Sequence, residues 1–192
     1  VIPMLRRLVA LMVLLLACAI AQAQQLATIP PLTGPVIDTT MTLDAATKQQ
    51  LEAQALALQQ RKGSQLQVLV IPTTQPEDIA SFANRVGNAW KIGRKDVGDG
   101  ILVIVAKNDR KMRIEVAKAL EGAVPDLAAI RIIDEEMKPR FRNNDFAGGL
   151  NAAVARLIGL VDGEALPAPS SGRDTDSSEG IDWENLAIFL FI

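Results

Sequence analysis

Two apolar patterns lie next to each other in the middle of the chain. Residues 101–106 form an unbroken apolar run of strand length, and residues 111–116 alternate between polar and apolar side chains. Asn108, Asp109 and Arg110 between them are typical of a tight turn. Two strands joined by so short a turn pair antiparallel. The sequence therefore predicts a β-hairpin whose first strand is buried on both faces and whose second strand lies nearer to a sheet edge.

Helical patterns surround this hairpin. A strand over residues 66–71 and a helix over residues 76–92 precede strand 101–106, which predicts a right-handed βαβ unit with parallel strands. Three more helices are predicted: from Thr42 or Asp44 to Gly63, from Pro125 to Met137 with Pro139 ending it, and from Asp145 onward. The fold class is therefore α/β, a three-layer α/β/α sandwich in which a small mixed sheet with one βαβ unit and one β-hairpin carries helices on both faces.

Residues 1–23 have the pattern of a signal peptide. Arg6 and Arg7 precede an apolar stretch, and an Ala-x-Ala cleavage pattern ends at Ala23. The alternative is a lipoprotein signal, because an apolar Leu-Leu-Ala sequence leads into Cys18. Both alternatives predict an exported protein that works on the periplasmic or cell-envelope side of the membrane.

The remaining segments differ in composition. Residues 24–41 are rich in Pro and Thr and predict an extended segment, whereas residues 42–162 carry the α/β patterns. Residues 163–181 are rich in Pro, Ser, Gly and Asp and predict a flexible linker. Residues 182–192 end in an apolar run too short to span a bilayer, which predicts the start of a truncated transmembrane helix or, alternatively, an apolar tail. The first alternative gives a domain anchored to the membrane by a C-terminal helix.

Composition excludes several kinds of chemistry. The chain has no histidine, and its one cysteine, Cys18, lies in the predicted leader. Imidazole acid–base catalysis, Ser-His-Asp triads, thiol catalysis and Cys-ligated zinc are therefore excluded from the domain. A formal net charge of −2 without a basic run argues against nucleic-acid binding.

Three carboxylates are predicted to gather at one end of the sheet. Asp99 precedes the first hairpin strand, and strand pairing brings it beside residues 117–119, which Glu121 and Asp126 follow closely. Such like charges repel one another unless a cation or an arginine neutralises them. Because carboxylate oxygens suit hard cations, we predict a Ca²⁺ site, or alternatively a Mg²⁺ site, at these three residues.

Each of these residues also has a structural alternative. Asp99 suits an Asx turn, Glu121 suits a solvated loop, and Asp126 suits a helix N-terminus. A further objection is that ligands of parallel α/β sheets usually bind at the carboxyl ends of strands, whereas this cluster lies at the amino ends.

Three more residues are accessory candidates. Asp38 suits a helix cap better than a role in the site, because chain direction places it at the end of the sheet opposite to Asp99. Arg94 lies at the same end as Asp99 and faces either an anion or solvent. Trp90 packs in the core or at the rim of the site.

Short motifs recur along the chain in a specific order. They are Pro31-Leu-Thr-Gly-Pro-Val-Ile-Asp38, Trp90-Lys-Ile-Gly93, Asp99-Gly-Ile-Leu-Val103, Asp109-Arg-Lys111, Leu120-Glu-Gly122, Pro125-Asp126, Pro139-Arg-Phe141 and Asp145-Phe-x-x-Gly-Leu150. In order and spacing, from about residue 30 to residue 161, they resemble the TPM domain family of YgcG-like secreted or membrane-anchored proteins. The resemblance implies a mixed sheet between helices, an extracytoplasmic domain, metal binding at the acidic cluster, and a phosphatase activity proposed for the family.

One departure from the family pattern concerns the predicted site. Ala117, Lys118 and Ala119 stand where the family usually has Gly-x-Gly, which suggests an altered loop. Two functions remain open. The first is a membrane-tethered binding or assembly module with a divalent-cation site and a membrane or envelope protein as partner. The alternative is a metal-dependent phosphatase of phosphate esters. Because no motif supplies a nucleophile or general base, the sequence favours the binding module.

Overall fold

The computed structural model describes Arg6 and residues 26–164. Apart from Arg6, the predicted signal peptide lies outside the described residues, as do the lipid-attachment alternative at Cys18, the C-terminal apolar run and nearly all of the predicted linker. Among the residues described, no helix has both the length and the apolar character needed to cross a membrane.

A four-stranded sheet forms the centre of the domain. Its order is β1 (Val36–Asp38), β2 (Gln65–Ile71), β3 (Gly100–Ala106) and β4 (Lys111–Val116). The first three strands are parallel, and β4 pairs antiparallel with β3, so the predicted βαβ unit and hairpin are both confirmed. The strand β1 was not predicted as such, because three residues are too short to show a pattern. The sheet therefore begins within the extended segment assigned to residues 24–41.

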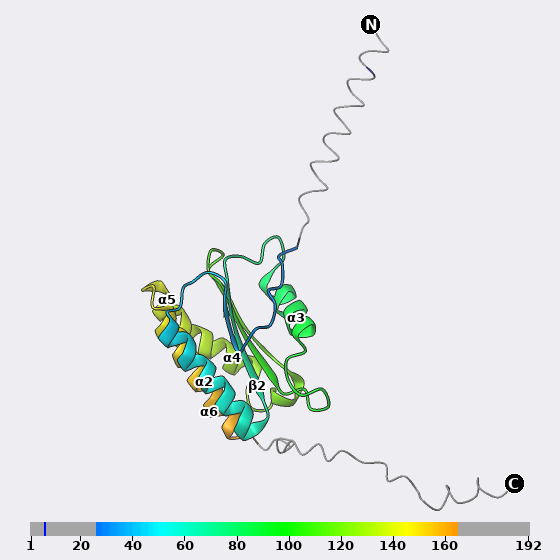
Figure 1. Ribbon diagram of the computed structural model, residues 1–192, viewed down its shortest axis with the longest axis vertical. Coiled ribbons are helices and arrows are strands. Elements are labelled where there is room, and N and C mark those ends of the chain that lie inside the picture. The colour runs from blue at the N-terminus through cyan, green and yellow to red at the C-terminus, as the bar shows by residue number, and fades with distance from the viewer. Residues whose placement is uncertain (1–5, 7–25, 165–192) are drawn as a thin grey trace, which may run out of the picture.

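Helices cover both faces of this sheet (Figure 1). They are α2 (Ala45–Lys62), α3 (Ile79–Trp90), α4 (Asp126–Ile132), α5 (Lys138–Arg142) and α6 (Phe146–Asp162). One apolar cluster joins α3 to Leu102 and Ile104 of β3, and the other joins α2, α4 and α6 to Val103 and Val105. Alternate side chains of one buried strand thus serve two cores, as expected for a strand in the middle layer. The three-layer sandwich is confirmed.

The helices begin and end where the local chemistry predicts. Asp44 caps α2 by accepting a hydrogen bond from the Thr47 N–H at 2.7 Å, and Asp145 caps α6 in the same way. Gly63 ends α2 in the left-handed region with φ of 78°, which costs glycine little.

The predicted end of the third helix at Pro139 is wrong. Helix α4 continues through a π-helical segment at Ile133–Met137 into α5, which contains Pro139. In this segment the Lys138 N–H donates to the Ile133 carbonyl, five residues back. The wider turn is the reason proline is tolerated, because its ring would otherwise clash with the carbonyl four residues earlier.

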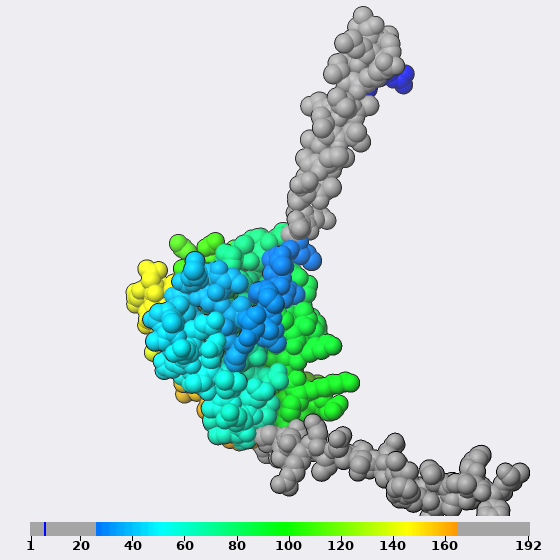
Figure 2. All heavy atoms as spheres, viewed as in Figure 1, coloured from blue at the N-terminus to red at the C-terminus, as the bar shows by residue number. Residues whose placement is uncertain are grey.

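The extended N-terminal segment is fixed against α3. Trp90 Nε1 donates to the Pro30 carbonyl at 3.0 Å, and Arg85 Nη2 donates to the Ala27 carbonyl at 2.7 Å. In Figure 2 this segment, in blue, lies between the cyan surface of α2 and the green surface beside it. It therefore covers the side of the sheet at which β1 lies, whereas β4 forms the opposite edge.

Candidate functional site

Asp99 has a partner of its own within the fold. Its side chain is fully buried, and its Oδ2 accepts hydrogen bonds from Arg94 Nε at 2.9 Å and Arg94 Nη2 at 2.7 Å. Its Oδ1 accepts from the Arg94 backbone N–H at 2.9 Å, and Ser64 Oγ donates to Oδ2 at 3.3 Å. A guanidinium that binds a carboxylate through two nitrogens forms one of the stronger ion pairs in proteins. The positive charge beside Asp99 is therefore the arginine of the same loop.

The loop that carries this pair turns back on itself. Gly93 has φ of 96°, and a Cβ built there would lie 2.7 Å from the Gly100 backbone nitrogen. The Gly93 N–H donates to Gln65 Oε1 at 2.9 Å, which ties the loop to the start of β2. Only glycine allows this close approach, and the approach brings Arg94 onto Asp99.

The backbone of Asp99 lies where the sequence predicts, but the three carboxylates do not meet. The Ala117 N–H donates to the Gly100 carbonyl and the Ala119 N–H to the Gly98 carbonyl, which confirms the pairing. Glu121 and Asp126 are exposed, whereas Asp99 is buried against Arg94. Within residues 26–164 no three acidic, histidine or cysteine side chains form a group that could hold a metal ion. As arranged here, these residues do not fit a Ca²⁺ or Mg²⁺ site.

The accessory candidates have structural partners. Asp38 accepts hydrogen bonds from the Thr40 N–H and the Leu43 N–H, both at 2.8 Å, and it lies opposite Val70 at the carboxyl end of the sheet. Trp90 packs against the α3-side core and donates to Pro30. Both residues therefore organise the N-terminal segment, and the cap of α2 is Asp44 rather than Asp38.

The departure at Ala117, Lys118 and Ala119 does not distort the loop. A short 3₁₀ turn at Lys118–Leu120 follows β4, and Ala117 has φ of −75°. Neither alanine is among the residues with positive φ in the described chain, so this loop does not require glycine at either position.

The carboxyl end of the sheet carries a different kind of surface. A pocket of about 750 Å³, which we call the basic hollow, lies between the β3–β4 hairpin, α5 and the start of α6. It is lined by Val105, Ala106, Lys107, Asn108, Arg110, Lys111, Met112, Lys138, Phe141, Arg142, Asn144 and Phe146. Five of these side chains are cations and none is a carboxylate.

The cations of the basic hollow differ in how they are held. Lys107 Nζ donates to Thr42 Oγ1 at 3.1 Å and lies 5.2 Å from the centre of the Phe146 ring. Lys138 pairs with Asp134 four residues earlier. In the described part of the chain, Arg110, Lys111 and Arg142 form no ion pair. The positive charges of Arg110 and Arg142 are therefore available to an anion from outside, whereas the Lys111 charge also acts on Asp109.

Apolar rings form part of the same hollow. The Phe141 and Phe146 rings pack with their centroids 4.7 Å apart and their planes tilted by 39°. A Cβ built on Gly149 would collide with the Phe141 ring, so the absence of a side chain at Gly149 makes room for this pair. The rings thus hold α5 against α6 beside the cations.

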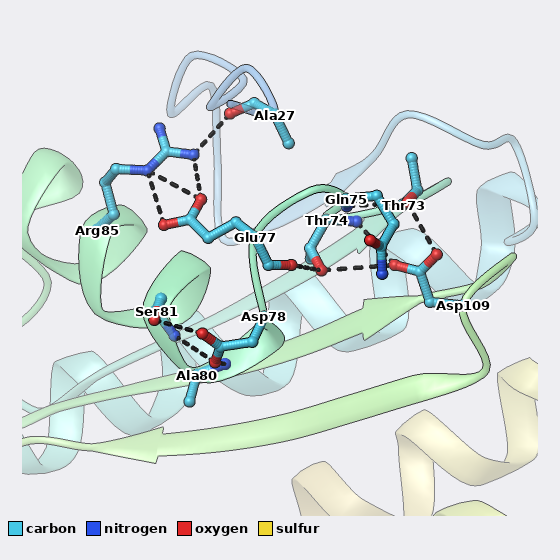
Figure 3. A network of polar contacts seen from close by, with 10 residues as sticks. All are labelled: Ala27, Thr73, Thr74, Gln75, Glu77, Asp78, Ala80, Ser81, Arg85 and Asp109. Carbon is cyan, nitrogen blue, oxygen red and sulfur yellow. Dashed lines mark hydrogen bonds and ion pairs between the residues drawn. The ribbon is translucent and has the colours of Figure 1, made fainter. Parts of the chain in front are cut away.

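The hairpin that carries three of the cations is anchored by Asp109. Its side chain accepts hydrogen bonds from Thr73 Oγ1 and from the Thr74 N–H, both at 2.8 Å (Figure 3). Burial raises the pKa of Asp109, but these hydrogen bonds and the nearby Lys111 charge outweigh it and lower the pKa below 3.8. Asp109 is therefore an ionised side chain whose hydrogen bonds link the hairpin to the β2–α3 loop.

The β2–α3 loop is itself fixed. Thr74 Oγ1 donates to the Glu77 carbonyl at 3.0 Å, and the Glu77 carboxylate accepts from Arg85 Nη2 at 2.7 Å (Figure 3). Arg85 in turn donates to Ala27. A continuous polar network thus runs from the N-terminal segment to the hairpin, which holds the hairpin in a defined position.

A second hollow adjoins the first along the free edge of β4. This edge groove, of about 520 Å³, shares Arg110, Lys111, Met112 and Lys138 with the basic hollow. Its other lining residues are Ile79, Arg113, Ile114, Asp126, Ala129, Ile130, Ile133 and Asp134. The β3–β4 hairpin therefore lies between two recessed surfaces.

The basic hollow was not predicted from the sequence. Its cations are spread from Lys107 to Arg142 and form no run, so only the folded chain gathers them. The one available signal was the rule that parallel α/β sheets bind ligands at the carboxyl ends of their strands. That rule argues against a ligand site at the amino end of the sheet, where Asp99 lies, and for one at the carboxyl end, where the hollow lies.

The fold places the chain among small α/β sandwich proteins. Its sequence matches the TPM domain over residues 36–160, and the chain belongs to the TPM domain family. The predicted resemblance is thereby confirmed. No curated protein matches the chain.

Three solution NMR structures share this fold. The N-terminal domain of a P. gingivalis protein is 26% identical, with a TM-score of 0.64, over 68% of this chain and 83% of that one. The BA42 protein of the psychrophilic bacterium Bizionia argentinensis is 17% identical, with a TM-score of 0.56, over 65% and 84%. The N-terminal domain of the Corynebacterium glutamicum protein cg2496 is 13% identical, with a TM-score of 0.54, over 79% and 93%. The last two likenesses show the fold alone.

Proposed function

We propose that this TPM domain is a non-catalytic binding module that takes an anionic ligand in the basic hollow. The observation that carries the proposal is the hollow's lining, in which five cations and no carboxylate surround a recess at the carboxyl end of the parallel strands. Convergent cations in a concave surface attract and hold an anion. The ends of parallel strands are also the usual ligand position in α/β sheets.

The chemistry of the lining favours binding over catalysis. The hollow offers amines, guanidiniums, two amides and two aromatic rings, which bind and orient a ligand. The alternative function, a metal-dependent phosphatase, needs a metal-bound water or a nucleophile beside the phosphate. No hydroxyl, thiol or carboxylate lines the hollow, and Asp99 is engaged by Arg94 at the other end of the sheet. We therefore favour the binding module over the phosphatase.

The proposal is tested by calorimetric titration of inorganic phosphate and of sulfate into the full chain at low ionic strength. We expect one binding site whose affinity falls as sodium chloride is added, because exposed charges are screened by salt. Arg110→Gln and Arg142→Gln should each weaken binding at least tenfold, since a hydrogen bond to a charged group contributes about 1.5–3 kcal/mol and about 1.4 kcal/mol is a factor of ten. Absence of binding would contradict the proposal.

The matched control is Arg156→Gln. This residue is exposed and lies ten positions beyond Phe146 on α6, about 15 Å along the helix. It removes the same charge without touching the hollow, so binding should not change. An equal loss in this variant would show that net charge, rather than the hollow, governs binding.

We further propose that the module is exported and anchored to the membrane, where a membrane or envelope protein is its partner. The support is the leader pattern of residues 1–23 and the apolar run that begins after Glu184. Protease added to intact spheroplasts should digest the domain. Protection of the domain, together with digestion after lysis, would contradict an extracytoplasmic location.

A further inference from the structure

We infer that the free edge of β4 is a docking site for an extended segment of a partner protein, which adds to the sheet as a fifth strand. This surface is separate in kind from the anion site, because it offers backbone hydrogen bonds and apolar side chains. Strand addition of this type takes its affinity from main-chain hydrogen bonds and its specificity from the pockets for alternate side chains.

The register of the hairpin shows which backbone groups are available. The Ala117 N–H bonds to the Gly100 carbonyl, and Glu115, Arg113 and Lys111 repeat this pattern opposite Leu102, Ile104 and Ala106. The N–H and C=O groups of Met112, Ile114 and Val116 therefore point away from β3. In the described chain β4 is the last strand of the sheet, so these groups have no strand partner.

The walls of the edge groove suit a strand with apolar side chains. Ile79 at the start of α3 lies on one side, and Ile130 and Ile133 of the α4 region lie on the other. Ile130 is 53% exposed and Leu127, three residues earlier on the same helix, is 60% exposed. Leu127 therefore extends the apolar wall beyond the groove. An added strand would cover surface that the monomer leaves in water.

Charge decides between the possible occupants. Arg110 and Lys111 form no ion pair in the described chain and stand at the hairpin end of the groove, whereas Arg113, two residues further along β4, pairs with Glu115. A second copy laid antiparallel along β4 and centred on Ile114 would face Lys111 with Ala117 and Arg110 with Lys118, so it would bring no carboxylate to these two cations. The occupant is therefore a segment of another protein, with alternating apolar side chains and acidic residues at the hairpin end.

The experiment selects ligands from a random nonapeptide display library on the full chain. We expect enrichment of sequences that alternate apolar and polar residues and carry Asp or Glu near one end. The best peptide, measured by fluorescence polarisation, should bind at least tenfold more weakly after N-methylation of alternate amides or after replacement of its acidic residues by Lys. Failure to enrich such sequences, or indifference to N-methylation, would overturn strand addition.

Two readouts locate the peptide on the chain. Hydrogen exchange of the Met112, Ile114 and Val116 amides should slow at least tenfold when the peptide is added, whereas the Arg113 and Glu115 amides already bond to β3. Ile130→Asp should weaken the peptide at least tenfold and leave phosphate binding unchanged, because Ile130 lines only the edge groove. Slower hydrogen exchange at other amides only, or a peptide affinity in Ile130→Asp equal to that of the wild type, would contradict binding at the β4 edge.

The remaining outcomes separate this inference from the anion site. Phosphate binding without peptide binding would support the proposed function and overturn the docking edge. Peptide binding without phosphate binding would support the docking edge and overturn the proposed function. The free chain should be monomeric by light scattering. Concentration-dependent protection of the same three amides without peptide would show that a second copy occupies the edge, which contradicts the inferred partner.

Discussion

The side chain of Asp99 is directed at Arg94 and Ser64, whereas Glu121 and Asp126 lie on the surface. Sequence patterns predict where the backbone of Asp99 lies, because strand pairing follows from the apolar runs and the turn. They do not predict the direction of one side chain, which depends here on the close approach of Gly93 to Gly100. The prediction that Arg94 faces an anion or solvent is wrong, because its guanidinium pairs with the buried Asp99 carboxylate.

Arg94→Gln tests how much stability this pair contributes. The substitution leaves the Asp99 carboxylate buried without a positive partner, which costs about 3–5 kcal/mol when one member of a buried pair is removed. Urea unfolding gives the free energy of unfolding. The double variant Arg94→Gln/Asp99→Asn should lose less than the two single variants add up to. A loss below about 1 kcal/mol in Arg94→Gln would contradict a structural role for the pair.

The response to calcium tests whether Asp99, Glu121 and Asp126 bind a metal ion. A ligand that binds only the folded state raises the melting temperature by mass action. Because Arg94 already neutralises Asp99, and Glu121 and Asp126 do not join it, millimolar Ca²⁺ should leave the melting temperature of the full chain unchanged. A rise that Asp99→Asn or Glu121→Gln abolishes would restore the metal site predicted from the sequence.

At the scale of single elements, the apolar patterns were sufficient for most of the fold. The predicted strand over residues 111–116 coincides with β4, and the buried run at residues 101–106 differs from β3 by one residue. Asp145 was predicted to cap the last helix, and it does so. The failures have local causes: β1 is three residues long, and the π-helical turn before Pro139 leaves no signal in the apolar pattern.

The central strand β3 provides a direct test of the layered fold. Ile104 is fully buried in the α3-side core, so Ile104→Ala should cost about 2–5 kcal/mol through lost burial and the cavity left behind. Chemical denaturation measures this cost. Leu127→Ala, which removes an exposed side chain, is the control and should change stability by less than about 0.5 kcal/mol. Equal small effects in both variants would mean that β3 is not the middle layer.

The hairpin provides a test that depends on pH. The pKa of Asp109 is lower in the folded chain than its ordinary value of 3.8, because its hydrogen bonds with Thr73 and Thr74 and the Lys111 charge outweigh the effect of burial. The unfolded chain then binds the proton more tightly, so the stabilisation is present above pH 3.8 and is lost as pH falls through the folded pKa. Asp109→Asn should be less stable than wild type at pH 7, and the difference should shrink below pH 4. A stability difference between the two proteins that stays constant with pH would contradict an ionised Asp109 that links the hairpin to the β2–α3 loop.

At the scale of the whole molecule, the two ends of the sheet have different roles. The amino end is closed by the buried pair of Arg94 and Asp99, while the carboxyl end presents the basic hollow. The sequence could not show this division, because three of the five cations come from the hairpin and two from α5. Their gathering depends on Asp109, which holds the hairpin to the β2–α3 loop, and on the Phe141–Phe146 pair, which holds α5 to α6.

The most direct measurement of the central claim is a map of backbone amide chemical shifts in the full chain as inorganic phosphate is added. The shifts should change at residues 107–112 and 138–146, saturate with phosphate, and diminish in Arg142→Gln but not in Arg156→Gln. The amides around Arg94 and Asp99 should remain where they are. Changes centred on residues 92–100 and 117–126, with none at the hairpin, would contradict the account by placing the ligand site at the acidic end of the sheet.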